Sequence, residues 1–168
     1  MSHGNKQQWI LAKRPQDVPD PSEVVFQEAA IPETTAAMVL VKNHYISLDP
    51  AIRLWMSDIP NYLPPIPIGD PIRATVVGQV IESGSDDLAA GDFVFGLGGW
   101  ETHSTAPAEF WTKIPSDSEF PLHYYGNMLG AVGLTPYFAI VDVGQAQAGQ
   151  TMLMSAAAGA VGSIGGQI

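Results

Sequence analysis

The segment best suited to chemistry is a run of small residues, Ala156-Ala157-Ala158-Gly159-Ala160-Val161-Gly162. It fits the spacing GxGxxG if Ala157 takes the place of the first glycine, and it fits the looser AxxGxxG from Ala156. Small residues let such a turn approach a pyrophosphate, while the N–H groups of the following helix point at it. The residues predicted to bind a nucleotide cofactor are therefore Ala157, Gly159, Ala160, Val161 and Gly162.

Two upstream elements must hold this turn in place. The apolar run at 151–155 is typical of a buried parallel strand that leads into it. Before that run, Thr135 suits a helix N-cap, Pro136 suits the first helical position, and Gly144 can close the helix in the left-handed conformation. A strand, a glycine turn and a helix in this order favour a dinucleotide-binding fold over an Ala/Gly-rich helix packed closely on a sheet.

The first two thirds of the chain alternate short β-prone runs with turn signals. The runs lie at 9–12, 24–28, 38–47, 73–83, 93–96 and 109–114. Proline, glycine and aspartate separate them, and this spacing predicts a barrel or a sandwich. All seven basic residues precede Pro115, where the character of the sequence changes. We therefore predict one domain over residues 1–120 and a second that starts in residues 121–168.

Composition excludes several classes of function. A formal net charge of −10 disfavours binding to nucleic acid, which requires a basic surface. The chain contains no cysteine, which removes disulfides, thiolate nucleophiles and cysteine-containing zinc sites. The polar N-terminus lacks the apolar stretch of a secretory signal, so the cytoplasm is the expected location. Gly162 and Gly166 have GxxxG spacing, but the apolar run at 152–164 is shorter than the roughly 20 residues that span a membrane.

Six blocks in a fixed order resemble the zinc-independent branch of the medium-chain dehydrogenase/reductases, close to the curcumin, alkenal and prostaglandin reductases. The blocks are WILAKRP at 9–15, ISLDPAIRLWMSD at 46–58, GQVIESG at 78–84, AGDFVFGLGGW at 90–100, LGAVGLTPY at 129–137 and SAAAGAVG at 155–162. The resemblance implies an α/β protein: a GroES-like β-barrel followed by a Rossmann doubly wound domain, inside which this chain stops. It also implies NADPH as cofactor, a homodimer, and reduction of the C=C bond of α,β-unsaturated aldehydes or ketones.

The resemblance also assigns individual residues. Tyr62 matches a pocket tyrosine that contacts the substrate carbonyl, although it equally suits an aromatic residue packed on a proline loop. Thr135 takes a position beside the nicotinamide. Relatives commonly have a second pocket tyrosine where this chain has Ala51, so the pocket is expected to be altered there. The block at 129–137 also lacks a methionine and a proline that the family has near the nicotinamide.

Other polar and aromatic residues have simpler interpretations. Asp49 and Arg53 are expected to form an ion pair that shapes the loop after the third strand. Trp55 and Trp100 either line a hydrophobic cleft or, more commonly for aromatic residues, fill the core. Glu101 and His103 are too few ligands for a metal site, so no metal is expected. Three histidines lack chemical partners in the sequence and are expected to be ordinary surface or packing residues: His3, His44 and His123.

Three alternatives to an enone reductase stay open at this point. One is a quinone reductase of the same superfamily. Another is a catalytically silent NADPH-binding or sensor protein, which the loss of the tyrosine at Ala51 suggests. The third is a β-barrel binding module with a short extension. The last is disfavoured because a strand and a glycine turn without the rest of their sheet would leave buried backbone groups unpaired.

The anchor for the adenosine end of the cofactor is expected after Ile168, because the acidic or basic residue that contacts the ribose lies about 20 positions beyond the turn. We therefore predict that residues 1–168, expressed alone, bind no measurable NADPH in a calorimetric titration. Micromolar binding would show that the cofactor site has been placed wrongly.

Overall fold

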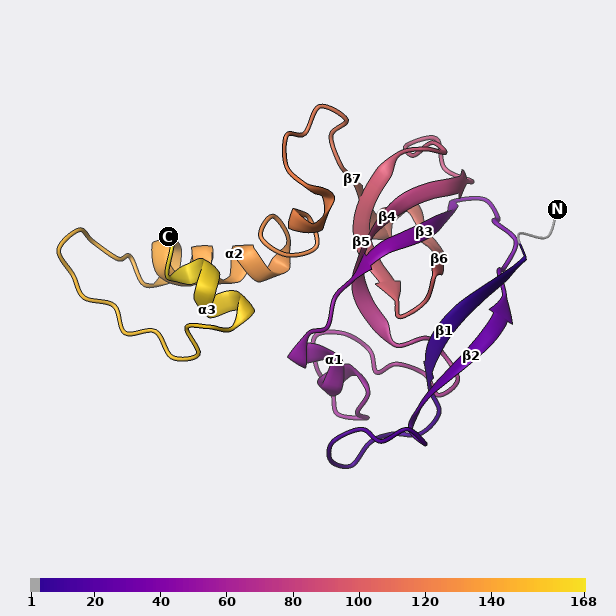
Figure 1. Ribbon diagram of the computed structural model, residues 1–168, viewed down its shortest axis with the longest axis horizontal. Helices are drawn as coiled ribbons and strands as arrows, with labels where there is room; N and C mark the ends of the chain where they lie inside the picture. Colours follow the sequence, from indigo (N-terminus) through magenta and orange to yellow (C-terminus); the bar gives the residue numbers. More distant parts are fainter. Residues whose placement is uncertain (1–3) are drawn as a thin grey trace. The chain divides into compact units, whose positions relative to one another are not determined.

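The computed structural model describes residues 4–168, which divide into two compact units at Ser118/Glu119 (Figure 1). The first unit contains all the strands of the described chain, and the second contains short helical segments joined by turns. The assignment of these units to a barrel domain and a cofactor domain stays a prediction. None of the helices between residues 4 and 168 has both the length and the apolar character needed to cross a membrane.

The first unit is built from two antiparallel sheets. Strands β1 and β2 form a two-stranded ribbon, and the larger sheet has the order β6-β3-β4-β5-β7. The elements are β1 Asn5–Leu11, β2 Val24–Ala30, β3 Met38–Ile46, α1 Pro50–Trp55, β4 Arg73–Ser83, β5 Phe93–Gly99, β6 His103–Pro107, η1 Ala108–Phe110 and β7 Trp111–Lys113. Every predicted β-prone run overlaps a strand, and the run at 109–114 also includes the last two residues of η1.

Strand β6 was absent from the sequence prediction. Its sequence HSTAP has no apolar alternation, and it forms through pairing with β3, where Met38 faces Pro107 and Lys42 faces His103. At the other side of the sheet, β7 reaches β5 only because residue 96 is glycine. A Cβ atom there would lie 1.9 Å from the carbonyl oxygen of Phe110. Both edges of the sheet therefore depend on tertiary pairing that local propensity does not encode.

Two apolar clusters form the core of the first unit. One lies within the larger sheet and comprises Val39, Val41, Val76, Val80, Leu88, Val94 and Trp111. The other comprises Leu11, Ile52, Trp55, Met56, Ile66, Ile72 and Ala74, and it joins α1 to the ends of β1 and β4. Helix α1 therefore presents Ile52 and Trp55 to the core and leaves Leu54 half exposed.

Strand β1 is fastened along its length to segments distant in sequence. The N–H of Trp9 donates to the carbonyl oxygen of Trp100 at 2.8 Å, and the N–H of Ile72 donates to the carbonyl oxygen of Trp9 at 2.9 Å. The N–H of Thr102 donates to the carbonyl oxygen of Gln7 at 2.9 Å. These bonds place the two-stranded ribbon against the turn that links β5 to β6.

The second unit contains η2 Leu122–Tyr124, α2 Ala131–Tyr137, η3 Phe138–Val143 and α3 Ala160–Gly165. Helix α2 begins at Ala131 with Gly130 as its N-cap, so the predicted cap at Thr135 is wrong. The Thr135 hydroxyl instead donates to the carbonyl oxygen of Ala131 at 2.8 Å. An earlier start is possible because Gly133 has no Cβ atom, which would lie 1.8 Å from the carbonyl oxygen of Met128.

The end of this helical segment also differs from the prediction. Pro136 lies inside α2, where it lacks the N–H that an α-helix would use, and the next turn widens into the π-helical η3. Gly144 has an ordinary φ of −76°, whereas Gln145 takes the left-handed conformation with φ of 46°. The closing residue therefore falls one position later than the glycine suggested.

The predicted strand at 151–155 is wrong. These residues form an extended segment that ends in a turn, and Leu153 is 97% exposed. A strand requires a partner for its backbone groups, and within residues 119–168 no strand is present to pair with it. Helix α3 instead packs on α2 and η3 through Gly165, whose Cβ would lie 3.0 Å from Pro136 Cβ and 3.4 Å from Ile140 Cδ1.

Candidate functional site

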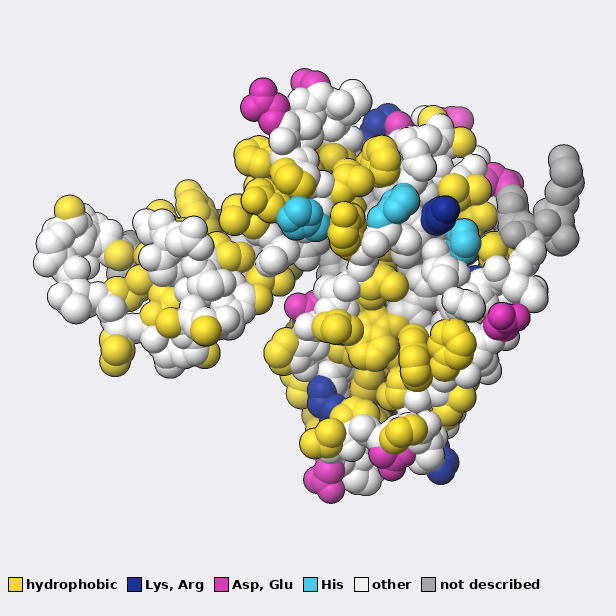
Figure 2. Space-filling view, in the orientation of Figure 1, with side chains coloured by type: hydrophobic (Ala, Val, Ile, Leu, Met, Phe, Trp, Pro, Cys, Tyr) yellow, Lys and Arg dark blue, Asp and Glu magenta, His cyan; other side chains and the backbone are white. Residues whose placement is uncertain are grey.

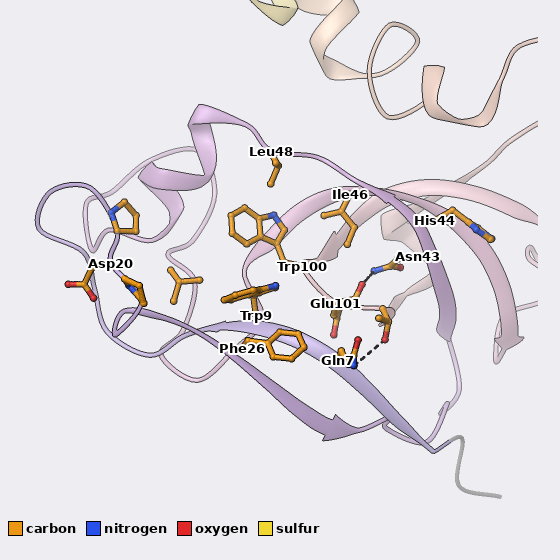
Figure 3. A pocket seen from close by; sticks show the side chains of 14 residues that line it. Gln7, Trp9, Asp20, Phe26, Asn43, His44, Ile46, Leu48, Trp100 and Glu101 are labelled. Carbon is orange, nitrogen blue, oxygen red and sulfur yellow. Dashed lines mark hydrogen bonds between the residues drawn. The ribbon is translucent and has the colours of Figure 1, made fainter.

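The first unit carries an open apolar groove, here named the Trp9 groove, beside the β1–β2 ribbon. Its apolar walls include Trp9, Phe26, Ile46, Leu48 and Trp100, and its volume is about 740 Å³. Figure 3 shows these side chains converging from β1, β2, β3, the segment between β3 and α1, and the turn after β5. Figure 2 shows hydrophobic side chains gathered over this face of the unit, between α1 and the ribbon. The groove therefore suits an apolar ligand.

A second groove, named the Arg53 groove, lies beside α1 and also has a volume of about 740 Å³. Residues that belong to it alone include Val18, Pro50, Ile52, Arg53 and Met56. It shares Pro19, Leu48 and Trp100 with the Trp9 groove. The two grooves are thus neighbours with a common boundary.

Trp100 is held firmly at this boundary. Its backbone N–H donates to the carbonyl oxygen of Ile72 at 2.8 Å, and its carbonyl oxygen accepts the bond from Trp9. Its indole N–H donates to the carbonyl oxygen of Ser47 at 3.2 Å. The cleft interpretation of Trp100 is therefore correct, whereas Trp55 is only 6% exposed and belongs to the core.

A buried polar network supports the Trp9 groove from one end. The Lys6 ammonium group donates to the Glu101 carboxylate, and the two side chains are 9% and 6% exposed. The Asn43 amide donates to the carbonyl oxygen of Glu101 at 2.7 Å and to Ser104 Oγ at 2.9 Å. Because the lysine and glutamate charges compensate each other, this end of the groove presents a polar but neutral surface.

The loop that borders the Arg53 groove is fixed by arginine, but not through the predicted ion pair with Asp49. The Arg53 guanidinium donates to the carbonyl oxygens of Asp17 and Pro15, each at 2.9 Å, and to Ser57 Oγ at 2.6 Å. A planar guanidinium can satisfy several backbone carbonyls at once, which favours this arrangement over one carboxylate contact. Arg53 therefore ties α1 to the 15–17 loop.

Charged residues at the rim of the Trp9 groove are few. Asp20 lines this rim, and hydrogen bonds from Ser22, first from its side chain and then from its backbone N–H, lower the pKa of the Asp20 carboxyl. The backbone N–H of Ser22 lies 2.6 Å from Asp20 Oδ1. Asp20 is thus charged at neutral pH, and its carboxylate accepts hydrogen bonds within its own turn.

Tyr62 lies outside both grooves. Its side chain is 71% exposed, and its ring stands edge-on to Trp55 with the ring centroids 6.1 Å apart. Ala51, where relatives have the second tyrosine, is half-buried and packs against the core cluster that contains Trp55. The substrate-contact role predicted for Tyr62 stays a prediction.

The glycine turn forms a compact backbone loop before α3. Ala156 takes the left-handed conformation with φ of 49°, and the N–H of Gly159 donates to its carbonyl oxygen at 2.9 Å. Gly159 is the N-cap of α3, and its carbonyl oxygen accepts the N–H of Ser163 at 2.8 Å. The N–H groups of residues 160–162 thus precede the first bond of this helix. A Cβ on Gly162 would lie 2.3 Å from the Ala156 carbonyl oxygen, so only glycine fits.

The remaining sequence candidates do not form a site. Between residues 4 and 168 there is no group of three or more side chains arranged to hold a metal ion. His103 Nδ1 lies 3.1 Å from Thr102 Oγ1, and the ring of His123 packs edge-on to Tyr124 at 4.8 Å. His44 lies at the edge of the Trp9 groove, near Phe93. His3 is outside the described residues.

Sequence reasoning missed most of the walls of the Trp9 groove. Trp9 contributed only to a family block, and Phe26 and Ile46 were expected simply as strand residues. Trp9 and Phe26 face each other across the β1–β2 pair, with ring centroids 5.1 Å apart. That pairing becomes visible in the sequence once the register of the ribbon is known. The buried pair of Lys6 and Glu101 joins residues 95 apart and leaves no local signal.

Comparison with known proteins identifies similar chains. Residues 7–114 match a family described as the N-terminal domain of oxidoreductase. The chain is 36% identical over 160 residues to NADPH-dependent curcumin reductase of Escherichia coli K12, covering 95% of this chain and 46% of that protein. It is 40% identical over 131 residues to the NADP(+)-dependent 2-alkenal reductase of Nicotiana tabacum, covering 77% and 38%.

A solved structure shows the same similarity in three dimensions. The crystal structure of CurA in complex with NADPH from Vibrio vulnificus matches with a TM-score of 0.86 and 30% identity. This match covers 96% of the chain and 48% of that protein. The chain thus spans about half the length of the curcumin reductase relatives that it matches.

The buried pair of Lys6 and Glu101 generates a prediction about stability. Glu101→Gln leaves the ammonium group buried without a counter-charge, so we expect the free energy of unfolding to fall by about 3–5 kcal/mol in urea titrations. The double variant Lys6→Met/Glu101→Leu removes both charges and should recover most of that loss. A double variant as unstable as the single one would contradict this account.

The pair of Lys113 and Asp92, with 2.7 Å between Nζ and Oδ2, is the matched control, because its side chains are more exposed, at 50% and 18%. Lys113→Met should cost less than about 1 kcal/mol. The hydrogen bond from the Lys113 side chain lowers the pKa of Asp92 below its ordinary value of 3.8. The small contribution of this pair to the free energy of unfolding is therefore present at pH values above 3.8. It is lost as the pH falls through the lowered pKa of Asp92 in the folded state.

Proposed function

Because this chain belongs to the zinc-independent medium-chain dehydrogenase/reductase family of the curcumin, alkenal and prostaglandin reductases, we propose that the full-length protein reduces the C=C bond of α,β-unsaturated aldehydes and ketones with NADPH. The family resemblance and the α/β fold class predicted from the sequence are confirmed by these matches. The observation that carries the proposal is the apolar, charge-compensated surface beside residues 46–53, in a chain whose relatives are NADPH-dependent oxidoreductases.

The residues of the glycine turn fit a dinucleotide. The absence of a Cβ atom at Gly162 keeps the turn compact, and small side chains at Ala157 and Gly159 leave its backbone accessible to a pyrophosphate. We assign Ala160 and Val161 to the same site through their N–H groups, and Thr135 to the nicotinamide end by family position. NADPH, when bound, supplies the hydride. The protein then contributes placement of the two reactants.

The grooves of the first unit supply the substrate surface in this proposal. Their apolar walls stabilise the carbon chain of an unsaturated carbonyl compound, and burial there excludes water from that chain. The hydroxyl of Tyr62 is proposed to donate to the substrate carbonyl, where negative charge develops during reduction. Its 71% exposure makes the hydroxyl accessible to a ligand. Family relationship further suggests a cytoplasmic homodimer.

Quinone reduction is the alternative within this superfamily, and a silent NADPH-binding or sensor protein is the alternative outside catalysis. Ala51 supports the silent NADPH-binding or sensor alternative, because this residue packs against the core and offers no hydroxyl to a substrate. Trp100 packs on the same cluster as Ala51 and supplies an aromatic face near it. An apolar site without that tyrosine can still bind an enone.

The enone assignment predicts a substrate preference. Full-length protein should oxidise NADPH when given benzylideneacetone or cinnamaldehyde, and it should not do so with the saturated ketone benzylacetone. Initial rates at the nicotinamide absorbance measure this. Faster turnover of a benzoquinone than of any enone would favour the quinone reductase, and tight NADPH binding without turnover of either class would favour the sensor.

The cofactor assignment predicts an effect of one methyl group. Gly162→Ala places a Cβ against the Ala156 carbonyl oxygen and should weaken NADPH binding by the full-length protein by at least about tenfold, through a displaced turn. Gly166→Ala is the matched control, because its Cβ would meet only ordinary contact at 3.4 Å. Calorimetric titration of both variants measures the difference. Equal affinities would show that the turn does not hold the cofactor.

A further inference from the structure

The boundary between the two grooves is the feature with a consequence for selectivity. Trp100 lines both grooves, together with Leu48 and Pro19. Figure 3 shows its indole between Trp9 and Leu48. A ligand that extends from one groove into the other passes the side chains that the two grooves share, of which Trp100 is the largest.

We propose that Trp100 is a specificity-determining residue, whose indole separates the Trp9 groove from the Arg53 groove and limits the length of the substrate that the enzyme accepts. This inference rests on the reductase function proposed above and adds to it a restriction on substrate size. If the reacting end of a long substrate occupies one groove, the other end of that substrate lies in the second groove.

The indole is suited to separate the grooves because its ring is hydrogen-bonded and its backbone is fixed on both sides. Its N–H is bound to the Ser47 carbonyl oxygen, and its backbone is bonded to Ile72 and to Trp9. The next residue, Glu101, is anchored by the buried Lys6 ammonium group. The indole cannot rotate away without breaking its hydrogen bond to Ser47, which is worth about 0.5–1.5 kcal/mol net.

The side chains of the grooves determine which ligands can extend past the Trp100 indole. Trp9 and Phe26 offer aromatic faces, and Ile46 and Leu48 offer aliphatic surface. The Glu101 carboxylate at the edge of the Trp9 groove is compensated by Lys6. A neutral ligand with a planar apolar tail therefore fits the Trp9 groove, whereas an anionic tail would meet Asp20 at the rim.

The test compares two ketones that share the same reacting styryl carbonyl group, benzylideneacetone and the longer dibenzylideneacetone. In full-length protein, Trp100→Ala should raise the ratio of kcat/KM for the long ketone over the short one by about tenfold or more. This size is expected because even one methylene in a hydrophobic pocket changes discrimination about 10-fold or more. Trp100→Phe keeps a ring against the core and should raise the ratio less.

Trp111→Phe is the matched control. Trp111 is 6% exposed, lies in the other core cluster, and has a buried indole nitrogen without a hydrogen-bond partner among the described residues. This substitution should leave the ratio unchanged, and thermal melting checks that all variants fold cooperatively.

The outcomes separate the two proposals. Wild-type turnover of the short ketone, with ratios that stay the same or fall in both Trp100 variants, would overturn the role of Trp100 and leave the reductase function standing. Absence of enone turnover by the wild-type protein would overturn the proposed function, and the role of Trp100 with it.

Discussion

The arrangement of the first unit depends on the pairing of β1 with segments that lie far from it in the chain. Backbone hydrogen bonds join Trp9 to Trp100 and to Ile72, and they fix the ribbon against the turn after β5. The buried pair of Lys6 and Glu101 adds a specific register, because a shift by one residue would turn Lys6 to the opposite face. Charge burial of this kind contributes little net stability, but an unpaired charge is costly, so misregistered pairings are disfavoured.

The groove follows from this pairing. The same register that buries Lys6 puts Trp9 beside Phe26 on the ribbon and brings Trp9 against the backbone of Trp100. The apolar walls are then set by strands and by a turn bonded on both sides. A binding surface built on such elements is better preorganised than one built on free loops, so less entropy is lost when a ligand binds.

Much of the first unit could be predicted from the sequence, because its strands are marked by β-branched and aromatic residues between turn signals. The run at 73–83 is a strand over that full range. Strand β6 could not be predicted because its sequence is polar, and its pairing with β3 is tertiary. For the site, Trp100 was identified as a cleft candidate, but the Arg53 contacts were not, since backbone carbonyls leave no trace in a sequence.

The second unit shows the limit of local patterns in a different way. Residues 151–155 have the apolar composition of a buried strand, yet they remain unpaired, and Leu153 is almost fully exposed. The apolar composition of a segment determines how much free energy its burial contributes. Whether a β-strand forms depends on a neighbouring strand with which its backbone can pair. Gly162 was a better guide than Gly144, because steric contact within its own turn decides its role. A Cβ atom on Gly162 would lie 2.3 Å from the carbonyl oxygen of Ala156.

Ala51 is not among the residues that line either groove. The family resemblance implies a tyrosine at this position, whereas Ala51 is half-buried against the cluster on which Trp100 also packs. Among the residues that line the Arg53 groove, Trp100 supplies the aromatic surface. Its indole N–H donates to a backbone carbonyl, so Trp100 offers a ligand a planar face without a free hydrogen-bond donor. In the function proposed above, recognition in this groove would therefore rest mainly on shape and apolar contact.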